Sequence, residues 1–314
     1  MRNNIAIIIL NYKNYSDTIR CIESILQEYP EEVNIVVVDN ASDNGSLSEI
    51  EASFSMRTKV GYWSEAENKR EYDDFNILLV QNQKNGGYAV GNNVGLKVAY
   101  SLGFRYLMVL NNDTMFSGTE LRGLTNVLDE YPDALCVGPI LYKADRKTFD
   151  LNCAKRRATY FDFFRLSYFG RWLKTKRWQK EYYYLSKDPQ IDKVMPVDLI
   201  SGACMMFDAE RITQVGYFDE GTFLYYEEDI LAEKAKRNGY RFYFQPNVCL
   251  VHEGAKTMKN HSHSEITLRS SYSSAVYYLT KWRGTSLLTA RLFCIGKYLF
   301  MKLYLIKKGI SKGR

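Results

Sequence analysis

The stretch IAIIILNYKNYSDTIRCIESILQ, residues 5–27, establishes the architecture of the chain. Its first six residues are an unbroken apolar run rich in isoleucine, which is typical of a strand covered on both faces, and a helical pattern over about 16–27 follows. Similar runs predict strands at 34–38, 77–80 and 106–110, with a helix at 88–100. Because parallel neighbours need crossover connections, this alternation predicts an α/β fold with a mostly parallel central sheet flanked by helices.

The remaining segments are expected to surround this sheet. Residues 47–74 are polar and weakly periodic, which indicates a surface excursion. Residues 155–187 are aromatic and basic and are expected to form an inserted lobe or lid, and a further strand is expected at 203–207. We therefore expect one domain over 1–262, including the insert, and a helical, basic and amphipathic C-terminal extension over 263–314.

Composition excludes several classes of protein. The net charge of +6, from 42 basic and 36 acidic residues, is too small to indicate a nucleic-acid partner. The six cysteines are scattered singly, which indicates buried thiols in a reducing cytoplasm rather than a disulfide framework. The apolar run from Ile5 to Leu10 is too short for a secretory signal, and no uncharged run reaches the roughly 18 residues that a membrane span requires.

Polar side chains stand where the predicted strands end. In parallel sheets, ligands bind beyond the carboxyl ends of the strands, so we expect these side chains to converge on one crevice. They are Asn11, Tyr12, Asp39, Asn40, residues 82–85 and residues 111–113.

The segment LMVLNNDT, residues 107–114, predicts a site for a hard divalent cation. A buried strand here delivers Asp113 to the sheet edge, and Mg²⁺ or Mn²⁺ takes oxygen ligands while leaving positions for substrate phosphates. The alternative is an ordinary turn, in which Asn and Asp are common. Asp39, after the second strand, is placed to accept hydrogen bonds from a base or ribose.

The segment NGGYAVGNNVG, residues 85–95, predicts a close approach of the backbone to a ligand. Gly86 and Gly87 precede a helix start and would admit a phosphate or ribose. A turn that merely caps the helix is the alternative. The spacing is not GxGxxG, so a dehydrogenase fingerprint is absent.

A triplet of carboxylates, Glu227, Glu228 and Asp229, stands before a helical pattern. A helix dipole favours acidic groups at this position without any catalytic role. However, mutual repulsion raises the proton affinity of adjacent carboxylates toward that of a general base, so one of the triplet is a catalytic candidate. His252, at the end of another apolar strand, is a candidate for metal or diphosphate contact as well as for a structural role.

Taken together, these motifs resemble the family 2 glycosyltransferases, in particular the bacterial rhamnosyltransferase-like branch that builds capsule and O-antigen polysaccharides. The resemblance covers about Ile5 to Thr257, and its strength lies in the order and spacing of modest motifs. They are LNYK at 10–13, VDNASD at 38–43, NGGYAVGNN at 85–93, LNND at 110–113, SGAC at 201–204, GYFDE at 216–220, EED at 227–229 and HEG at 252–254.

The resemblance implies the GT-A fold, so that residues 1–262 are the catalytic domain. It implies an inverting, metal-dependent transfer of a sugar from a UDP- or dTDP-sugar, with Asp39 at the base or ribose, Asp113 on Mg²⁺ or Mn²⁺, and His252 assisting the metal or diphosphate. The donor-binding candidates are Asn11, Tyr12, Asp39, Asn85, Gly86, Gly87, Asn92, Asn112 and Asp113.

Two departures from the family pattern affect this assignment. The metal motif reads Asn111-Asn112-Asp113 and lacks the first carboxylate of a full DxD. The family usually shows Glu-Asp and a second acid two positions later. Aligning Tyr225 makes Glu228 the base, which we favour, whereas aligning the carboxylates as Glu-Asp without gaps makes Asp229 the base.

The acceptor is expected to be a saccharide or a lipid-linked saccharide in cell-surface polysaccharide synthesis. Glu227, Trp172 and Trp178 are acceptor-binding candidates, although the tryptophans equally suit packing of inserted helices. The segment 287–308 mixes apolar and basic side chains, as does a helix lying on an anionic membrane. We therefore expect a peripheral protein on the cytoplasmic face of the plasma membrane; packing on the catalytic domain or in a homodimer is the alternative.

Two other functions share parts of this pattern. A sugar-phosphate nucleotidyltransferase should carry a glycine-rich, basic phosphate loop near its N-terminus, and residues 11–15, NYKNY, are unlike one. A non-catalytic carbohydrate-binding or scaffold protein would need neither a base nor a metal, so the polar strand ends would be a coincidence.

Overall fold

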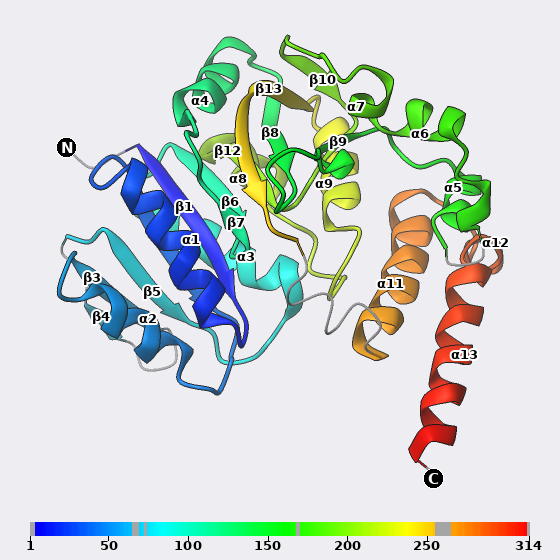
Figure 1. Ribbon diagram of the computed structural model, residues 1–314, viewed down its shortest axis with the longest axis horizontal. Coiled ribbons are helices and arrows are strands. Elements are labelled where there is room, and N and C mark those ends of the chain that lie inside the picture. Colours follow the sequence, from blue (N-terminus) through cyan, green and yellow to red (C-terminus); the bar gives the residue numbers. More distant parts are fainter. Residues whose placement is uncertain (1–3, 65–68, 72–73, 168–169, 255–264, 313–314) are drawn as a thin grey trace.

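The computed structural model of the protein describes residues 4–64, 69–71, 74–167, 170–254 and 265–312. Its centre is a mixed sheet of 11 strands, in the order β10-β13-β8-β12-β6-β1-β2-β5-β3-β4, with β7 paired to β13 (Figure 1). Helices flank this sheet, and the predicted α/β class is confirmed. The predicted boundary at 262/263 and the insert residues Tyr168 and Phe169 lie outside the described residues.

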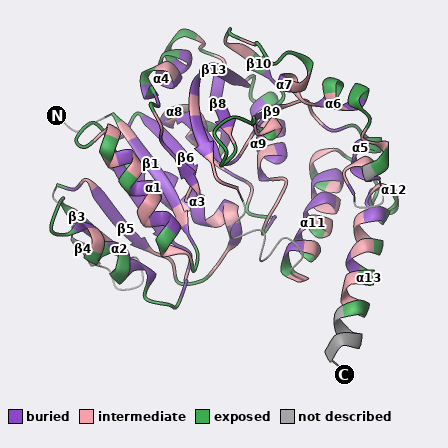
Figure 2. Cartoon of the chain, in the orientation of Figure 1, coloured by how far each residue is buried: buried purple, intermediate pink, exposed green. Residues whose placement is uncertain are grey.

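The parallel part of the sheet comes from the N-terminal half of the chain. It consists of β1 (Ile5–Asn11), β2 (Asn34–Asp39), β3 (Val60–Ser64), β5 (Ile77–Gln81) and β6 (Tyr106–Asn111). The middle strands are buried along nearly their whole length, as Figure 2 shows, which explains why their sequences are continuous apolar runs. Their carboxyl ends form one edge, so the polar residues that follow them lie at that edge.

The rest of the sheet mixes strand directions and brings late parts of the chain beside early ones. Strand β12 (Cys204–Asp208) runs antiparallel between β6 and β8 (Ala134–Tyr142), and β13 (Arg241–His252) runs parallel to β8. The short strand β7 (Thr114–Met115) pairs with the end of β13, with His252 opposite Thr114. Strands β10 (Met195–Val197) and β4 (Lys69–Glu71) form the edges.

The helices of the main domain largely follow the predicted alternation, but residues 47–74 differ. This segment contains part of α2 (Ser46–Phe54) and the strands β3 and β4, so the expectation of a mere surface excursion was wrong. Strand β3 is only half-buried yet pairs in parallel with β5, which a polar sequence does not reveal. The other helices here are α1 (Tyr15–Glu28), α3 (Gly87–Ser101), α4 (Leu121–Glu130), α8 (Ala209–Val215) and α9 (Glu227–Arg237).

The insert and the C-terminal helices form a second lobe beside the sheet (Figure 1). The segments η1 (Leu151–Cys153) and β9 (Ala154–Lys155) lead into the insert, and β9 pairs with β11 (Leu199–Ile200). The insert contains α5 (Tyr160–Arg165), η2 (Arg171–Leu173), α6 (Lys176–Tyr182) and α7 (Tyr184–Lys187). The C-terminal helices are α11 (Glu265–Tyr277), the π-helix η3 (Tyr278–Trp282), α12 (Leu287–Phe293) and α13 (Ile295–Lys312).

This second lobe has an apolar core of its own. Phe163 and Trp178 from the insert, Ile230 from α9, and Tyr278 and Cys294 from the C-terminal helices belong to one buried cluster. The C-terminal helices therefore pack on the insert and on the main domain. No helix within the described ranges has the length and apolar character needed to cross a bilayer.

Candidate active site

A cavity of about 570 Å³ opens beside the carboxyl end of β6, between the main domain and the second lobe. Five of the residues predicted from the sequence line it: Asp113, Glu227, Glu228, Asp229 and His252. They come from the loop after β6, the start of α9 and the end of β13. The structure thus brings the predicted metal-binding and acidic residues into one site.

Asp113 and His252 meet because β7 pairs with β13. The backbone N–H of Glu253 donates to the carbonyl of Asp113 (2.9 Å), and His252 Nε2 lies 3.4 Å from Asp113 Oδ1. On its other side, His252 Nδ1 lies 3.2 Å from Oδ2 of Asp150. Burial alone would lower the pKa of His252, but the hydrogen bonds to Asp113 and Asp150 outweigh it and raise the pKa to about 9.

Asp150 is a site residue that the sequence did not reveal. It follows β8 in a loop, where its Oδ1 accepts hydrogen bonds from the backbone and side-chain N–H groups of Asn152 (both 3.0 Å). An aspartate in a loop has no distinctive pattern, and only the three-dimensional fold places it next to His252. Metal-binding histidines usually donate their second ring nitrogen to such a carboxylate.

Asp113 and His252 fit a divalent cation. No group of three or more His, Cys, Asp or Glu side chains within the described segments is arranged to hold a metal alone. However, Mg²⁺ is commonly held by one or two protein ligands together with substrate phosphates, and Mn²⁺ accepts a similar set with imidazole. The side chains of Asp113 and His252 are 18% and 17% exposed and line the same cavity, and Asp150 orients the histidine. They can therefore supply the one or two protein ligands that such a cation needs.

The acidic triplet begins α9 in a conformation that separates the roles of its members. Tyr225 and Tyr226 both have positive φ angles, 74° and 72°, an uncommon left-handed conformation that turns the chain into the helix. Glu227 and Asp229 are buried, with exposed fractions of 3% and 8%, whereas Glu228 is half-buried. Glu228 Oε1 accepts a hydrogen bond from the backbone N–H of Gly202 (3.0 Å), which fixes it at the cavity wall.

Burial changes the protonation of the two less exposed acids. It raises the pKa of Glu227 to about 8, assisted by repulsion from Glu228. It also raises the pKa of Asp229 to about 6, against the opposing effect of Lys155. Lys155 lines the same cavity; burial lowers its pKa, but the charges of Asp229 and Glu228 outweigh burial and raise it.

The predicted nucleotide-binding residues of the first two strands form a tight network. Asp39 is 2% exposed and accepts from Asn11 Nδ2 (2.7 Å), Ser42 Oγ (2.5 Å), the Ser42 backbone N–H (2.9 Å) and Gln81 Nε2 (3.1 Å). Both oxygens of Asp39 are therefore engaged with protein donors, and Asn11 is fully buried. These residues shape the loop, whereas Tyr12, 43% exposed, presents its side chain on the surface.

Gly87 allows a close approach within the protein itself. Gly87 has φ +85°, and a Cβ there would lie 2.0 Å from the carbonyl oxygen of Phe223. The backbone N–H of Tyr88 donates to that same oxygen (3.0 Å). A close backbone approach thus exists at Gly87, where the partner is the loop that leads to the acidic triplet. Contact of Gly86 and Gly87 with a phosphate or ribose stays a prediction.

The remaining predicted donor residues support this region. Asn85 Oδ1 accepts from the Gly87 N–H (2.9 Å) and from Asn40 Nδ2 (2.8 Å). Asn92 is 1% exposed and donates to the Tyr88 carbonyl. Asn112 Nδ2 donates to Thr18 Oγ1 (3.0 Å), so this side chain is directed toward α1.

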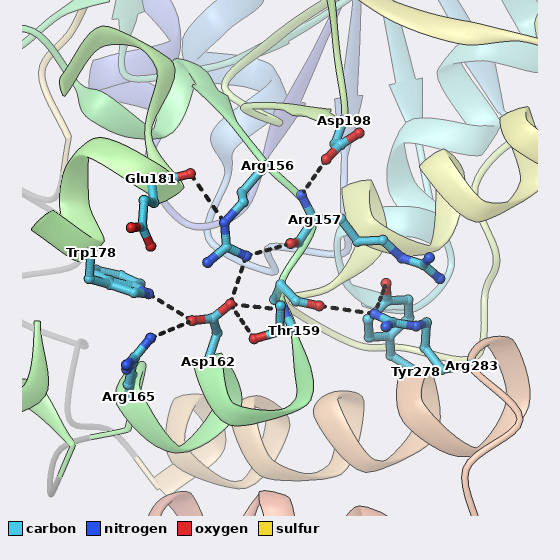
Figure 3. Close-up of polar contacts among 11 residues, drawn as sticks. Arg156, Arg157, Thr159, Asp162, Arg165, Trp178, Glu181, Asp198, Tyr278 and Arg283 are labelled. Carbon is cyan, nitrogen blue, oxygen red and sulfur yellow. Dashed lines mark hydrogen bonds and ion pairs between the residues drawn. The ribbon is translucent and has the colours of Figure 1, made fainter. Parts of the chain in front are cut away.

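Trp178 is not available for stacking on a sugar. It is 2% exposed, its ring lies 4.8 Å from that of Tyr182, and its Nε1 donates to Asp162 (2.7 Å). Figure 3 shows this contact within a network around the fully buried Asp162. The acceptor-binding expectation for Trp178 was therefore wrong, and its role is to pack the lobe. Trp172, 75% exposed on η2, does not line the cavity.

Comparisons with known proteins agree with this geometry. A model of the family described as glycosyl transferase family 2 matches residues 6–207. The low-salt glycan biosynthesis hexosyltransferase Agl10 of Haloferax volcanii is 25% identical over 240 residues, which are 76% of this chain and 63% of that relative. The chain thus spans less than two thirds of that relative's length.

Two solved structures share the fold. One is the mannosyltransferase PcManGT from Pyrobaculum calidifontis in complex with GDP-Man and Mn²⁺, with a TM-score of 0.54, 16% identity and coverage of 99% of this chain and 87% of that one. The other is GalNAc-T7 with UDP, GalNAc and Mn²⁺, with a TM-score of 0.56, 13% identity and coverage of 91% and 52%.

Proposed function

Since the chain belongs to glycosyl transferase family 2 and has the GT-A fold, we propose that it transfers a sugar from a nucleotide diphosphate donor to an acceptor hydroxyl, with inversion. One observation carries the proposal: Asp113 and His252 on one side, and Glu228 on the other, line the same cavity. A cation site and a carboxylate that faces a common space are what a displacement with a diphosphate leaving group requires.

The residues have distinct roles in this reaction. Glu228 takes the proton of the acceptor hydroxyl, whose oxygen forms a bond to the anomeric carbon on the face opposite the leaving group. The bond from that carbon to the phosphate oxygen breaks, and the nucleoside diphosphate leaves. Asp113 and His252 would hold Mg²⁺ or Mn²⁺, which would stabilise the charge on the departing diphosphate. Asp150 keeps His252 oriented for this role.

Glu228 is preferred over Asp229 as the base on two grounds. It is the most exposed member of the triplet, and the Gly202 N–H holds its carboxylate in place. Asp229 is more deeply buried, and its charge is opposed by that of Lys155. Glu227 keeps its proton at neutral pH and lines the acceptor part of the cavity in this proposal.

The C-terminal helices support a membrane-bound acceptor. Large apolar side chains lie exposed along α12 and α13: Leu288 (82%), Leu292 (66%), Leu299 (46%), Leu303 (55%) and Ile306 (58%). On α13, the spacing of four and three residues places Leu299, Leu303 and Ile306 along one face, with exposed Lys302 and Lys307 on the same helix. Leu288 and Leu292 are four residues apart on α12. This combination suits a helix at an anionic membrane surface. We propose that the enzyme works there, on the cytoplasmic face, on lipid-linked saccharides for the cell surface.

Vesicle binding tests the membrane proposal. Leu292→Asp combined with Leu299→Asp should abolish sedimentation with vesicles of anionic phospholipid, whereas Met56→Asp, at a 93% exposed apolar side chain on the main domain, should not. A change of oligomeric state in the double variant, without loss of vesicle binding, would instead assign this face to a homodimer.

The release of nucleoside diphosphate tests the activity. A panel of UDP-, dTDP- and GDP-sugars would be assayed with and without Mn²⁺ or Mg²⁺, together with acceptor glycolipids. Metal-dependent turnover of one donor should be lost in Asp113→Ala and reduced by at least roughly 100-fold in Glu228→Gln, in line with the loss of a general base. Turnover that survives in Asp113→Ala, in a correctly folded variant, would contradict the assignment.

A further inference from the structure

The turn that precedes β12, residues 201–203, lies between the cation site and the proposed base and lines the cavity. On one side, the carbonyl of Ala203 accepts a hydrogen bond from the Asn111 N–H (3.0 Å), at the end of the strand that leads into the cation site. On the other side, the Gly202 N–H donates to Oε1 of Glu228 (3.0 Å). The turn therefore sets where the base lies relative to the cation site.

A tyrosine that the reaction described above does not use holds this turn. Tyr88, at the start of α3, lines the same cavity, and its hydroxyl donates to the carbonyl of Gly202 (2.7 Å). This carbonyl and the N–H that binds Glu228 flank one Cα atom, so fixing the carbonyl limits the reorientation of the N–H. Burial, and after it the charge of Glu228, raises the pKa of Tyr88 well above its ordinary value, so the hydroxyl keeps its proton and remains a donor.

The backbone of Tyr88 holds the chain that carries the base. Its N–H donates to the carbonyl of Phe223 (3.0 Å), in the loop that leads into α9. Tyr225 and Tyr226, with their left-handed φ angles, then turn this loop into the helix. One residue thus contacts both the loop that carries Glu228 and the turn that binds its carboxylate.

The groups around the turn are in close contact. A Cβ at Gly202 would lie 2.6 Å from Oε1 of Glu228 and 2.9 Å from the hydroxyl oxygen of Tyr88, nearer than Cβ atoms come to other atoms. The ring of Tyr88 packs edge-on against Phe218, with ring centroids 5.7 Å apart. Tyr88, Gly202 and Glu228 therefore form one packed unit, in which a shift of one member displaces the others.

We infer that Tyr88 is a positioning residue, which acts through the turn at Gly202 to fix the Glu228 carboxylate relative to the cation site. This inference rests on the proposed transferase function, with Glu228 as its base. Inversion places the attacking oxygen opposite the leaving diphosphate, so a base that shifts toward or away from Asp113 no longer meets the hydroxyl proton in line with the reaction. In this role, Tyr88 makes no contact with the reacting atoms.

Nuclear magnetic resonance tests the contact without a substrate. In protein with isotopically labelled glycine, the Gly202 amide signal is identified by its absence from Gly202→Ala. Glu228→Gln should move this proton upfield, because an amide oxygen is a weaker acceptor than a carboxylate. Tyr88→Phe should move it in the same direction, whereas Tyr29→Phe should leave it in place. Tyr29 is a matched control, because its hydroxyl also donates to a backbone carbonyl, that of Thr119 (2.5 Å), and neither residue lines the cavity.

The kinetic test uses the donor that wild type turns over. Tyr88→Phe keeps the ring against Phe218 and should fold, lower kcat by roughly 10- to 100-fold, as expected for a base displaced by up to about 1 Å, and leave the donor KM unchanged. Gly202→Ala should have the same effect, because its Cβ meets only the ends of two side chains. Adding Tyr88→Phe to Glu228→Gln should lower kcat no further, since residues that act as a unit are not additive.

Either measurement can overturn the inference. A Gly202 signal that Tyr88→Phe leaves in place would overturn it, as would a kcat in Tyr88→Phe equal to that of Tyr29→Phe. Losses that multiply in the double variant would also do so, because Tyr88 would then act on the substrate directly and not through Glu228.

The outcome is separable from that of the proposed function. Turnover that is lost in Asp113→Ala but unaffected by Tyr88→Phe would keep the function and refute the positioning role. No turnover of any donor, with the Gly202 signal responding as expected, would refute the function and with it the role of Tyr88 in transfer, and would leave only the structural contact.

Discussion

Replacing Asp162 with Asn should destabilise the second lobe more than any surface change in it. Asp162 is fully buried and accepts hydrogen bonds from Arg156 Nη1 (2.7 Å), Trp178 Nε1 (2.7 Å), the Thr159 N–H (2.8 Å) and Thr159 Oγ1 (2.7 Å), as Figure 3 shows. Arg165 Nη1 lies 3.6 Å from the same carboxylate. The residue ties α5 to α6 and to the segment after β9; Lys155 of β9 and Tyr182 of α6 line the cavity.

The cost follows from the hydrogen bonds that an amide cannot accept. In its better orientation, the Asn oxygen keeps the donors of Arg156 and Thr159, while the NH₂ group faces the indole N–H of Trp178. One buried donor then loses its acceptor, which costs roughly 1–3 kcal/mol, and the guanidinium loses its counter-charge, which costs about 1.5–3 kcal/mol more. We expect Asp162→Asn to lower the free energy of unfolding by about 3–5 kcal/mol at pH 7.

The pH dependence gives this prediction a second signature. Burial raises the pKa of Asp162, but its hydrogen bonds to Arg156, Thr159 and Trp178 outweigh it and lower the pKa below the ordinary 3.8. A lowered pKa means that the stabilisation is present above pH 3.8 and is lost on further acidification. Urea titrations at pH 7 and pH 3 should therefore show a difference between Asp162→Asn and wild type that shrinks at the lower pH.

A matched variant separates burial from charge. Glu181→Gln removes a carboxylate of the same lobe whose ion pair with Arg177 is exposed, with side chains 54% and 90% accessible. It should cost about 0.5 kcal/mol or less. If Asp162→Asn proves no more destabilising than Glu181→Gln, the reasoning that the buried carboxylate holds the lobe together is refuted.

Three further perturbations test the site. Gly87→Ala should lower the free energy of unfolding by at least about 3 kcal/mol, because it places a side chain at a left-handed φ and against the carbonyl of Phe223. Gly239→Ala, with φ +80° but open space around it, should lower it by only about 1–2 kcal/mol. Equal denaturation midpoints for the two variants would argue against the close contact at Gly87. Because the fold raises the pKa of Glu227 from 4.5 to about 8, this group ionises at lower pH in the unfolded chain than in the folded one, and the stability falls as the pH rises from 4.5 to 8. Glu227→Gln should remove that decline in the midpoint of thermal unfolding. The same decline with pH in the variant and in wild type would contradict the raised pKa. Asp150→Asn should weaken Mn²⁺ binding by roughly 10- to 100-fold in calorimetry by releasing His252, and unchanged affinity would exclude this support.

The parallel part of the sheet could be predicted because its strands are buried on both faces. Runs such as Ile5–Leu10 leave no alternative to a covered strand, and the intervening helices require parallel neighbours. Strand β3 escaped prediction because it lies at the sheet's margin, where Tyr62 and Trp63 are only half-buried and the apolar pattern is weak. Antiparallel β12 and its neighbours depend on long-range pairing, which local periodicity does not encode.

The site shows the same division between local and long-range information. Asp113 and the acidic triplet follow or precede strong local patterns, and the structure does bring them together in one cavity. Asp150 has no local signal, because what distinguishes it is its partner His252, more than 100 residues away in the sequence. Trp178 was misjudged because composition alone does not tell whether an aromatic side chain faces solvent or a buried carboxylate.

The pairing of β7 with β13 has a consequence for the life of the newly made chain. His252 stands opposite Thr114, so the residue adjoining Asp113 and its histidine partner are separated by 138 positions in the sequence. Synthesis proceeds from the N-terminus, and a nascent chain that already displays Asp113 has no imidazole to complete the cation site. In the proposed function, a ribosome-bound fragment that ends before β13 therefore cannot complete the cation site, and transfer requires that this last strand of the sheet has docked.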